Sequence, residues 1–431
     1  MKIVIIGSGF TGLAAALKLK GQEVTIIEAD DRVGGLASGF TTAGQELERF
    51  YHHWFTSDTC IMRVVKELNL ESNLQYLESA TGLYYNTSFF RLSSPLDLLK
   101  FKAVSFTSRI RLAFFVLYAR RIKNWKKLEN ITASDWLRKI GGDEVYRVVW
   151  EPLLKGKFGP YAETISAVWF WKKLCLRGGS RAKNGKEQLV YFEGGFMQLS
   201  KKMAEETVKN GSTIRLNCQA KSIVTENNTI KGVLTSEGFI GCDKVLATVP
   251  IPIYRELLKS NASSQYLDSL DNIKYIGNVC LVMELDRSLS KYYWLNVNDP
   301  SFPFVGIIEH TNLVNKHLYG DRHIVYLSKY LPTSDPLYSL DSKDFLSFAA
   351  PYIRRMFPDF EISWVINASI WKSAHSQPIV SRNYSAKIPE VRSPVQGLYL
   401  STMAQIYPED RGTNYAIEYG ERAASIMIQD D

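Results

Sequence analysis

The first forty residues carry three glycines at the spacing G-x-G-x-x-G, placed between two apolar runs. Residues 3–6 are a short β-branched run, and residues 13–19 are good helix formers. A second apolar run, residues 24–27, ends in Glu28. The three glycines are Gly7, Gly9 and Gly12. This order predicts a strand, a tight turn, a helix and a second strand, which is the context in which such glycines bind a dinucleotide.

Each position in this motif has a chemical reason. Gly7 permits the turn, Gly9 lets the backbone approach a pyrophosphate, and Gly12 lets the helix pack closely on the strand. The helix N-terminus offers N–H groups and a partial positive charge to phosphates. Glu28 lies 21 residues after Gly7, where a carboxylate can accept from both ribose hydroxyls of an adenosine. Because it would repel a 2′-phosphate, a phosphorylated nicotinamide dinucleotide is disfavoured.

The start of the chain also has some features of a secretory signal peptide. Met1 and Lys2 precede an apolar, alanine-rich run. The three glycines interrupt that run, and a second strand ending in an acid follows at once. The dinucleotide interpretation is therefore preferred.

The residues after Glu28 indicate which dinucleotide binds. Arg32, Gly34 and Gly35 form R-x-G-G. Here the chain resembles the flavoprotein superfamily of amine oxidases, protoporphyrinogen oxidases and phytoene-type desaturases, which includes UDP-galactopyranose mutase. In that superfamily the turn runs along the FAD pyrophosphate, with an arginine that offsets phosphate charge. The resemblance implies FAD as the cofactor.

The resemblance extends to a histidine-containing segment. His52 and His53 follow the R-x-G-G turn, and the superfamily returns beside the flavin in this region. The pair is therefore predicted to touch the isoalloxazine ring or the substrate, with a catalytic role. The alternative is that one or both histidines only pack and hydrogen-bond in an aromatic corner.

Further positions follow from the resemblance alone. The adenine contact, made by strand backbone, maps near Ala220. Ser401 and Thr402 stand where many relatives carry an acid that binds ribityl or phosphate oxygens, and Thr402 and Met403 are the predicted cofactor contacts there. Glu151 and Lys155, within residues 150–159, are predicted to border the substrate cavity, although an exposed ion pair suits them equally well.

The last helix is predicted to cap the flavin. It begins after Arg411, and its first turn would direct backbone N–H groups at the flavin N1/O2 edge, where the helix dipole stabilises negative charge. Arg411 would add a full charge and is our third candidate catalytic residue. The residues that open this helix are Gly412, Thr413 and Asn414.

Charge and cysteine usage exclude several classes of protein. Residues 98–127 carry nine basic side chains and no acid, whereas the net charge of the chain is +8, so the remainder carries −1. Such local basicity argues against a general nucleic-acid-binding surface. Five widely spaced cysteines without a C-x-x-C pair suggest reduced thiols in the cytoplasm, and no metal-ligand spacing is present. No apolar run reaches about 18 residues, so a spanning helix is not predicted.

The basic segment has two interpretations. A helix starting at Arg109, with Ser108 as its N-cap, gathers basic residues in one stripe beside apolar residues such as Phe114 and Leu117. Such a helix either packs on the substrate domain with a solvated charged side, or lies in an anionic membrane surface. Peripheral membrane contact through residues 98–127 therefore remains an alternative to a purely cytoplasmic protein.

The resulting prediction is an α/β protein: a Rossmann-like FAD-binding domain with an inserted α+β substrate domain. The FAD-binding domain takes residues 1–60, 186–252 and 385–431. The substrate domain takes residues 61–185 and 253–384. The oligomeric state is left open.

The leading functional hypothesis is an oxidoreductase that moves a hydride between a small-molecule or lipid-like substrate and flavin N5. The lysine that amine oxidases carry near N5 maps to Asn278 or Val279, which argues against amine oxidation with oxygen as acceptor. A redox-neutral, flavin-dependent mutase acting on a sugar nucleotide is the alternative. A non-catalytic module like the GDP dissociation inhibitors is disfavoured because the phosphate-binding glycines are intact.

Overall fold

Five parallel strands form the sheet that contains the amino-terminal run. The computed structural model of the chain describes residues 1–91, 95–180, 187–259 and 261–430. Within it the strand order is β10-β2-β1-β14-β20. The strands are β1 (Lys2–Ile6), β2 (Glu23–Ile27), β10 (Thr213–Arg215), β14 (Lys244–Ala247) and β20 (Leu398–Leu400). Their β-branched side chains are almost fully buried, as expected of a parallel sheet covered on both faces.

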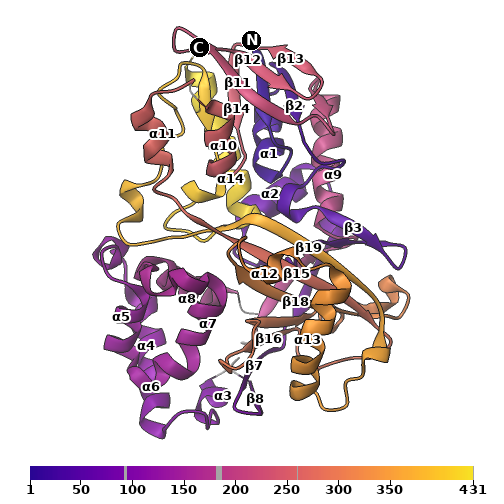
Figure 1. The fold of residues 1–431 in the computed structure, drawn as a ribbon, viewed down its shortest axis with the longest axis vertical. Helices are drawn as coiled ribbons and strands as arrows, with labels where there is room; N and C mark the ends of the chain where they lie inside the picture. The colour runs from indigo at the N-terminus through magenta and orange to yellow at the C-terminus, as the bar shows by residue number, and fades with distance from the viewer. Residues whose placement is uncertain (92–94, 181–186, 260, 431) are drawn as a thin grey trace.

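Helices and a small antiparallel sheet cover this parallel sheet (Figure 1). Helix α1 (Phe10–Lys18) packs along α14 (Thr413–Gln429) and α9 (Phe196–Lys209), while α2 (Thr59–Glu67) packs on α14. The antiparallel sheet consists of β11 (Ala220–Glu226), β12 (Thr229–Thr235) and β13 (Gly238–Gly241). The segment from Met1 to Glu28 thus has the predicted strand–turn–helix–strand order.

A seven-stranded sheet forms the other half of the molecule, in the order β19-β15-β18-β17-β16-β7-β8. β15 (Tyr275–Leu285) is buried along nearly its whole length because β18 and β19 flank it and α13 (Ser342–Met356) packs on it. The other strands are β7 (Thr81–Tyr85), β8 (Ser88–Arg91), β16 (Trp294–Val297), β17 (Gly306–Glu309), β18 (His323–Leu331) and β19 (Val365–Pro378).

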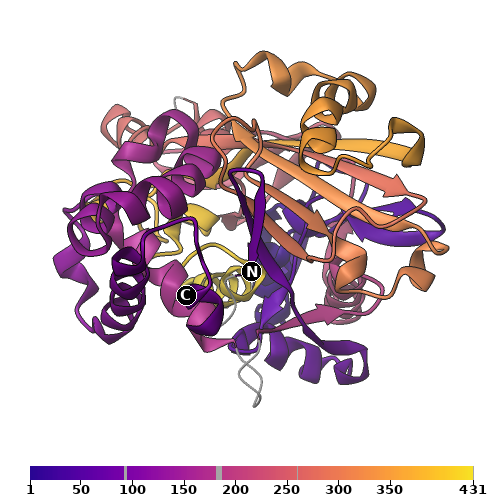
Figure 2. The ribbon, with the colours of Figure 1, turned by 90° about the horizontal axis from the view of Figure 1, so that it is seen from below.

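A group of helices lies beside the seven-stranded sheet (Figures 1 and 2). Helices α4, α5 and α8 pack on one another, and Trp171 Nε1 of α8 donates to the Ala119 carbonyl of α4 at 2.8 Å. The group comprises α3 (Pro95–Leu99), α4 (Phe106–Arg121), α5 (Ala133–Gly141), α6 (Asp143–Val145), α7 (Glu151–Phe158) and α8 (Ala167–Gly179).

Short elements connect these layers. Two further sheets are the hairpin β3–β4 and the three-stranded sheet β5-β9-β6; β4 and β9 contact α9, and β5 contacts α8. The remaining bounds are β3 (Gly39–Thr42), β4 (Gln45–Glu48), β5 (Trp54–Phe55), β6 (Leu74–Glu78), β9 (Gln188–Phe192), α10 (Ile251–Leu258), α11 (Ser264–Leu270) and α12 (Pro336–Ser339).

Helix α4 begins earlier than predicted. Ser105, not Ser108, is the N-cap, because the Ser105 side chain accepts a hydrogen bond from the Ser108 backbone N–H. Leu112, Phe115 and Ala119 are buried against neighbouring helices. The outward side mixes large apolar and basic side chains: Phe106, Ile110, Phe114, Leu117 and Tyr118 are exposed, and so are Arg111, Arg120 and Arg121.

The α/β fold class is confirmed by these two sheets and their helices. We retain the division into a discontinuous FAD-binding domain and an inserted substrate domain as a proposal. The separation of the parallel sheet from the seven-stranded sheet supports it. The predicted boundary between residues 185 and 186 lies outside the described residues. In the described ranges, no helix combines the length and apolarity needed to cross a membrane.

The contact between α1 and α14 generates a stability prediction. A Cβ at Gly420 would lie 2.2 Å from the Thr11 backbone carbonyl oxygen. We expect Gly420→Ala to lower the free energy of unfolding by about 1–3 kcal/mol, because the helices must separate to admit the methyl group. Differential scanning calorimetry would show a lower Tm.

Gly141→Ala is the matched control, since a Cβ at this helical glycine meets only Val145 Cγ1 at 3.8 Å. Its Tm should stay equal to that of the parent protein or rise. An unchanged Tm for Gly420→Ala would show that the two helices are not in close contact.

Candidate functional site

The carboxyl ends of the parallel strands bring distant residues to one edge of the sheet. Gly7 follows β1, Glu28 follows β2, Thr248 follows β14, and Ser401 follows β20. Backbone bonds continue the pairing past the strand ends, for example from Thr248 N to the Ile6 carbonyl at 2.9 Å. From β1 the strand order runs to β2 on one side and to β14 on the other. Open α/β sheets bind ligands at such a point, where the strand order reverses.

The first glycine turn places the N-terminus of α1 at this edge. A Cβ at Gly12 would lie 2.0 Å from the Gly7 carbonyl oxygen, so only glycine allows the helix to start so close to the strand. The first intrahelical bond runs from Leu13 N to the Gly9 carbonyl, at 3.0 Å. The preceding N–H groups of the helix are therefore directed toward the edge, as an anion site requires.

Glu28 is held in place by hydrogen bonds within the chain. Its Oε2 accepts from the backbone N–H and the hydroxyl of Ser8, both at 2.8 Å, and its Oε1 accepts from Asp30 N at 3.0 Å. An ionised carboxylate has about four acceptor positions. Three are used here, which leaves capacity for a ribose hydroxyl.

The R-x-G-G turn lies directly beside the first glycine turn. Gly34 N donates to the Ser8 carbonyl at 3.0 Å, and Gly9 and Gly34 form a parallel bridge. Gly34 has a φ of +109°, which favours glycine, and a Cβ at Gly35 would lie 3.3 Å from Gly9 Cα. The two turns thus form a strip of glycine backbone, in which Gly7 and Gly9 are half-buried and Gly35 is exposed, and such a strip suits a pyrophosphate.

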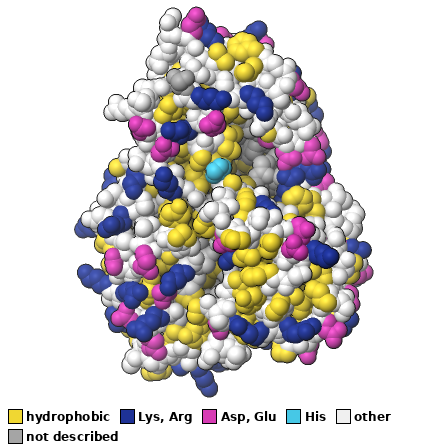
Figure 3. Space-filling view, in the orientation of Figure 1, with side chains coloured by type: hydrophobic (Ala, Val, Ile, Leu, Met, Phe, Trp, Pro, Cys, Tyr) yellow, Lys and Arg dark blue, Asp and Glu magenta, His cyan; other side chains and the backbone are white. Residues whose placement is uncertain are grey.

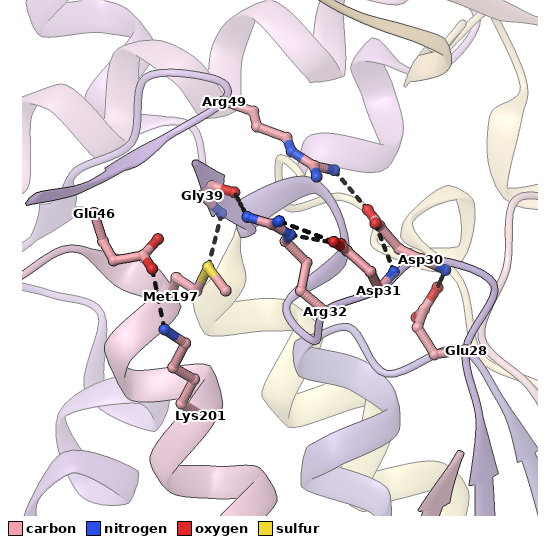
Figure 4. A network of polar contacts seen from close by, with 9 residues as sticks. All are labelled: Glu28, Asp30, Asp31, Arg32, Gly39, Glu46, Arg49, Met197 and Lys201. Carbon is pink, nitrogen blue, oxygen red and sulfur yellow. Dashed lines mark hydrogen bonds and ion pairs between the residues drawn. The ribbon is translucent and has the colours of Figure 1, made fainter. Parts of the chain in front are cut away.

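Arg32 is bound to the protein rather than free (Figure 4). Its guanidinium pairs with Asp31 at 2.7 Å and donates to the Gly39 carbonyl at 2.9 Å. The same pairing holds the pKa of Asp31 well below its usual range. In the same network Arg49 pairs with Asp30 at 2.6 Å. Asp31 therefore already balances the positive charge of Arg32, which was expected to offset a phosphate. Through its bond to Gly39, Arg32 instead links the turn to the start of β3.

The predicted adenine and ribityl positions lie close to the same edge. Ala220 begins β11, two residues after Cys218, whose N–H donates to the Glu28 carbonyl at 2.7 Å. Thr402 is buried and caps the 3₁₀ turn that starts at Met403, with its own N–H donating to the Gln405 side chain at 2.8 Å. The Thr402 side chain is engaged in this capping box.

The first turn of α14 is held by its side chains. Thr413 Oγ1 accepts from Trp54 Nε1 at 2.7 Å, and Asn414 Oδ1 accepts from Cys60 N at 2.8 Å. The first intrahelical bond runs from Ala416 N to the Gly412 carbonyl at 2.9 Å. The N–H groups before Ala416 have no acceptor within the helix, as the predicted flavin contact requires.

The two histidines face different neighbours. His52 Nδ1 contacts the Phe50 carbonyl at 2.5 Å; burial lowers its pKa to about 4, against that hydrogen bond, and the charge of Arg411 lowers it further. His53 Nδ1 contacts the Tyr293 hydroxyl at 3.0 Å, and its ring lies edge-on to Trp294. The structure therefore brings His52 near Arg411 and places His53 against β16.

Arg411 precedes α14 and contacts the seven-stranded sheet. Its Nε donates to Gln377 Oε1 at 2.8 Å, and its Nη2 donates to the Tyr330 hydroxyl at 3.2 Å. Both acceptors are uncharged. The guanidinium thus stands between the sheet carrying the dinucleotide turns and the proposed substrate domain.

Two lysines of α7 have different surroundings. Lys155 forms an ion pair with Glu151 at 2.9 Å, which agrees with the ion-pair interpretation of these two residues. Lys157 instead directs its Nζ toward Tyr330, 4.9 Å from the ring centre. Because residues two positions apart on a helix point about 200° apart, the spacing predicts that Lys155 and Lys157 face in opposite directions. The spacing does not tell which of the two faces inward.

Taken together, these residues fit FAD. The glycine strip and the N-terminus of α1 suit its pyrophosphate, Glu28 retains an acceptor position for its ribose, and the first turn of α14 offers N–H groups to its ring. No side chain needs to be removed from the strip, because glycines line it.

Comparison with known proteins gives related enzymes and related folds. The chain is similar to coproporphyrinogen III oxidase of Staphylococcus aureus (strain NCTC 8325 / PS 47), at 23% identity over 63% of this chain and 65% of the relative. It is similar to 1-hydroxycarotenoid 3,4-desaturase of Flavobacterium sp. (strain P99-3), at 26% identity over 60% of this chain and 58% of the relative. The alignments thus span less than two thirds of either relative.

The fold is shared with solved structures. Reduced UDP-galactopyranose mutase superposes with a TM-score of 0.76 at 14% identity, covering 99% of this chain and 95% of that protein. The family model described as "Flavin containing amine oxidoreductase" matches residues 10–428. The chain therefore belongs to the flavin containing amine oxidoreductase family.

Proposed function

We propose that the chain transfers a hydride between an organic substrate and flavin N5. The observation that carries this proposal is the convergence of two glycine turns, Glu28 and the α14 N-terminus, with Arg411 directly before that helix. Two-electron redox chemistry belongs to FAD when it is bound, and the residues of the chain bind, orient and move protons.

We assign the adenosine and diphosphate end to the parallel sheet. The backbones of Gly7, Gly9 and Gly12, with the adjacent R-x-G-G turn of Arg32, Gly34 and Gly35, would hold the pyrophosphate. Glu28 would accept from the ribose, and the backbone near Ala220 would meet the adenine. Thr402 and Met403 would meet the ribityl chain through their backbone, since the Thr402 side chain is engaged elsewhere.

We assign the ring end to the last helix and to Arg411. The N–H groups of Thr413 and Asn414, after Gly412, would stabilise negative charge at N1/O2 by about 0.5–2 kcal/mol. Arg411 would add a full positive charge. Both groups are fixed in place by hydrogen bonds, so they need no reorganisation during the reaction.

We assign proton transfer to His52. Its Nδ1 lies against a carbonyl oxygen and its pKa is low, so the neutral ring donates through Nδ1 and keeps Nε2 as an acceptor. The substrate would lose a hydride to N5 and a proton to Nε2, which forms a double bond in the product. His53 would position the loop through Tyr293.

A redox-neutral mutase is the second candidate. The likeness to UDP-galactopyranose mutase and the histidine-bearing loop favour it. It requires a flavin reduced beforehand and consumes no electron acceptor, so the two functions are separable by experiment.

We further propose that α4 contacts an anionic lipid surface. Phe114 and Phe106 are 68% and 60% exposed, although both are large apolar residues. The surrounding segment, residues 98–127, has nine basic side chains and no acid. Figure 3 shows basic side chains spread over this helical part of the molecule. Apolar side chains flanked by cations are typical of helices that lie in a membrane interface.

The adenosine assignment predicts weaker cofactor binding when Glu28 is changed. Glu28→Leu should raise the Kd for FAD roughly tenfold or more, because a charged hydrogen-bond acceptor is lost. Glu23→Leu, at the exposed first residue of β2 and paired with Lys2, should leave the Kd unchanged. Equilibrium ultrafiltration with FAD measures both. Equal Kd values for the two variants would remove Glu28 from the site.

The hydride assignment predicts loss of visible flavin absorption under anaerobic conditions. Coproporphyrinogen III and a 1-hydroxycarotenoid are the first substrates to mix with the FAD-loaded protein. UDP-galactopyranose, with and without dithionite, tests the mutase. Bleaching by a substrate supports hydride transfer. Turnover only after dithionite, with no acceptor consumed, would establish the mutase instead.

The lipid assignment predicts co-sedimentation with vesicles that contain phosphatidylserine. Phe114→Ser combined with Leu117→Ser should reduce the bound fraction several-fold, because apolar area that enters the interface is removed. Phe239→Ser, which changes another exposed phenylalanine, on β13, is the control. Equal, negligible binding of the parent protein to phosphatidylserine and to phosphatidylcholine vesicles would end the proposal.

A further inference from the structure

Four basic side chains and two acidic ones meet where α7, α8, β18 and the segment before α14 come together. Lys172 and Lys173 belong to α8, and Lys157 belongs to α7. The acids, Glu409 and Asp410, directly precede Arg411. Helices α7 and α8 follow one another along the chain, whereas β18 and the segment before α14 come from far beyond them.

The two acids form ion pairs with only two of these four basic side chains. Lys172 pairs with Glu409 at 2.6 Å, and Lys173 pairs with Asp410. Asp410 is buried and also accepts from Trp169 Nε1 at 2.9 Å. Over the described part of the chain, no ion pair involves Lys157 or Arg411. Two positive groups are thus left without a balancing charge.

Aromatic rings hold these two cations close to one another. Lys157 Nζ lies 4.9 Å from the Tyr330 ring centre and 5.6 Å from that of Trp169. Arg411 donates to the hydroxyl of the same Tyr330. Ring faces attract cations but do not neutralise them. The Tyr330 side chain therefore joins Lys157 and Arg411 into one positive site.

The surrounding charges show the same imbalance. Burial holds the pKa of Lys157 well below its ordinary value, and the charges of Lys173 and Arg411 lower it further, against Asp410. Burial alone would raise the pKa of Asp410, but Lys173, Lys157 and Arg411 bring it down to about 2. Burial and the neighbouring cations thus disfavour the charged form of Lys157, and a bound anion would favour it.

We infer that Lys157 and Arg411 form a subsite for a carboxylate of the substrate, a conclusion that rests on the proposed hydride transfer. A carboxylate accepts from an ammonium and a guanidinium together, and charge-assisted bonds of this kind are short and strong. The position of Arg411, beside His52 and before α14, places the anchored end of the substrate next to the reacting one. A pure hydrocarbon substrate would gain nothing from these two half-buried basic side chains.

Benzoate and benzamide are the probes, because they share a shape and differ in charge. We expect isothermal titration calorimetry on the FAD-loaded protein to give binding of benzoate at least roughly tenfold tighter than of benzamide. Lys157→Met should abolish most of this difference. Lys155→Met, two residues away, exposed and paired with Glu151, should keep it.

Three results would overturn the inference: equal affinity for the two probes, no detectable benzoate binding by the parent protein, or an unchanged benzoate affinity in Lys157→Met. Benzoate binding by the apoprotein but not by the FAD-loaded protein would also overturn it, by assigning the two cations to the flavin. If Lys157→Met does not fold, the comparison of probes on the parent protein still decides.

The test separates this inference from the proposed function. FAD loading is read from the visible spectrum before the titration, and benzoate binding requires no turnover. A yellow protein that binds benzoate yet is not bleached by any substrate would retain the carboxylate subsite and reject hydride transfer. A bleached protein without preference for benzoate would do the reverse.

Discussion

The parallel register of β1 with β2 on one side and β14 on the other determines where everything else in this protein can act. Because parallel strands end at the same edge, Gly7, Glu28, Thr248 and Ser401 meet there, although up to about 390 residues separate them in the chain. The close start of α1, which Gly12 alone allows, then aims a helix N-terminus at that edge. The seven-stranded sheet contributes from the other side through Tyr330 and Gln377, which both hold Arg411.

Positive charge is used in two distinct ways. On α4 it is exposed and mixed with outward apolar side chains, an arrangement that suits a surface rather than a small ligand. Around Asp410 it is enclosed by aromatic rings and exceeds the available carboxylates. Helix α8 connects the two regions, since Trp171 bonds to α4 while Trp169 bonds to Asp410. The net charge of the chain alone reveals neither the exposed basic residues of α4 nor the enclosed ones around Asp410.

Sequence reasoning was strongest where chemistry is local. The glycine spacing, the acid after β2 and the buried run of β15 each depend on neighbours in the chain, and the strands, the α1 helix and the family follow from them. It was weaker where two segments must meet. Lys157 resembled any surface lysine until Tyr330 of β18 was placed beside it. The Ser105 cap of α4 was missed because two serines stand three residues apart and both suit a helix start. His52 and His53 have different surroundings because His53 contacts Tyr293, which lies far along the chain.

Glu28 illustrates how little the dinucleotide turn must change when a ligand arrives. Its carboxylate is already fixed by Ser8 and Asp30, and the second glycine turn is tied to Ser8 by Gly34 N. Ordering a loop on association costs conformational entropy for every residue that it immobilises. In this turn the residues were already ordered when the chain folded, so ligand binding does not have to order them. The apoprotein should therefore load its cofactor by simple docking into a rigid cradle, with a rate set by diffusion and orientation rather than by rearrangement.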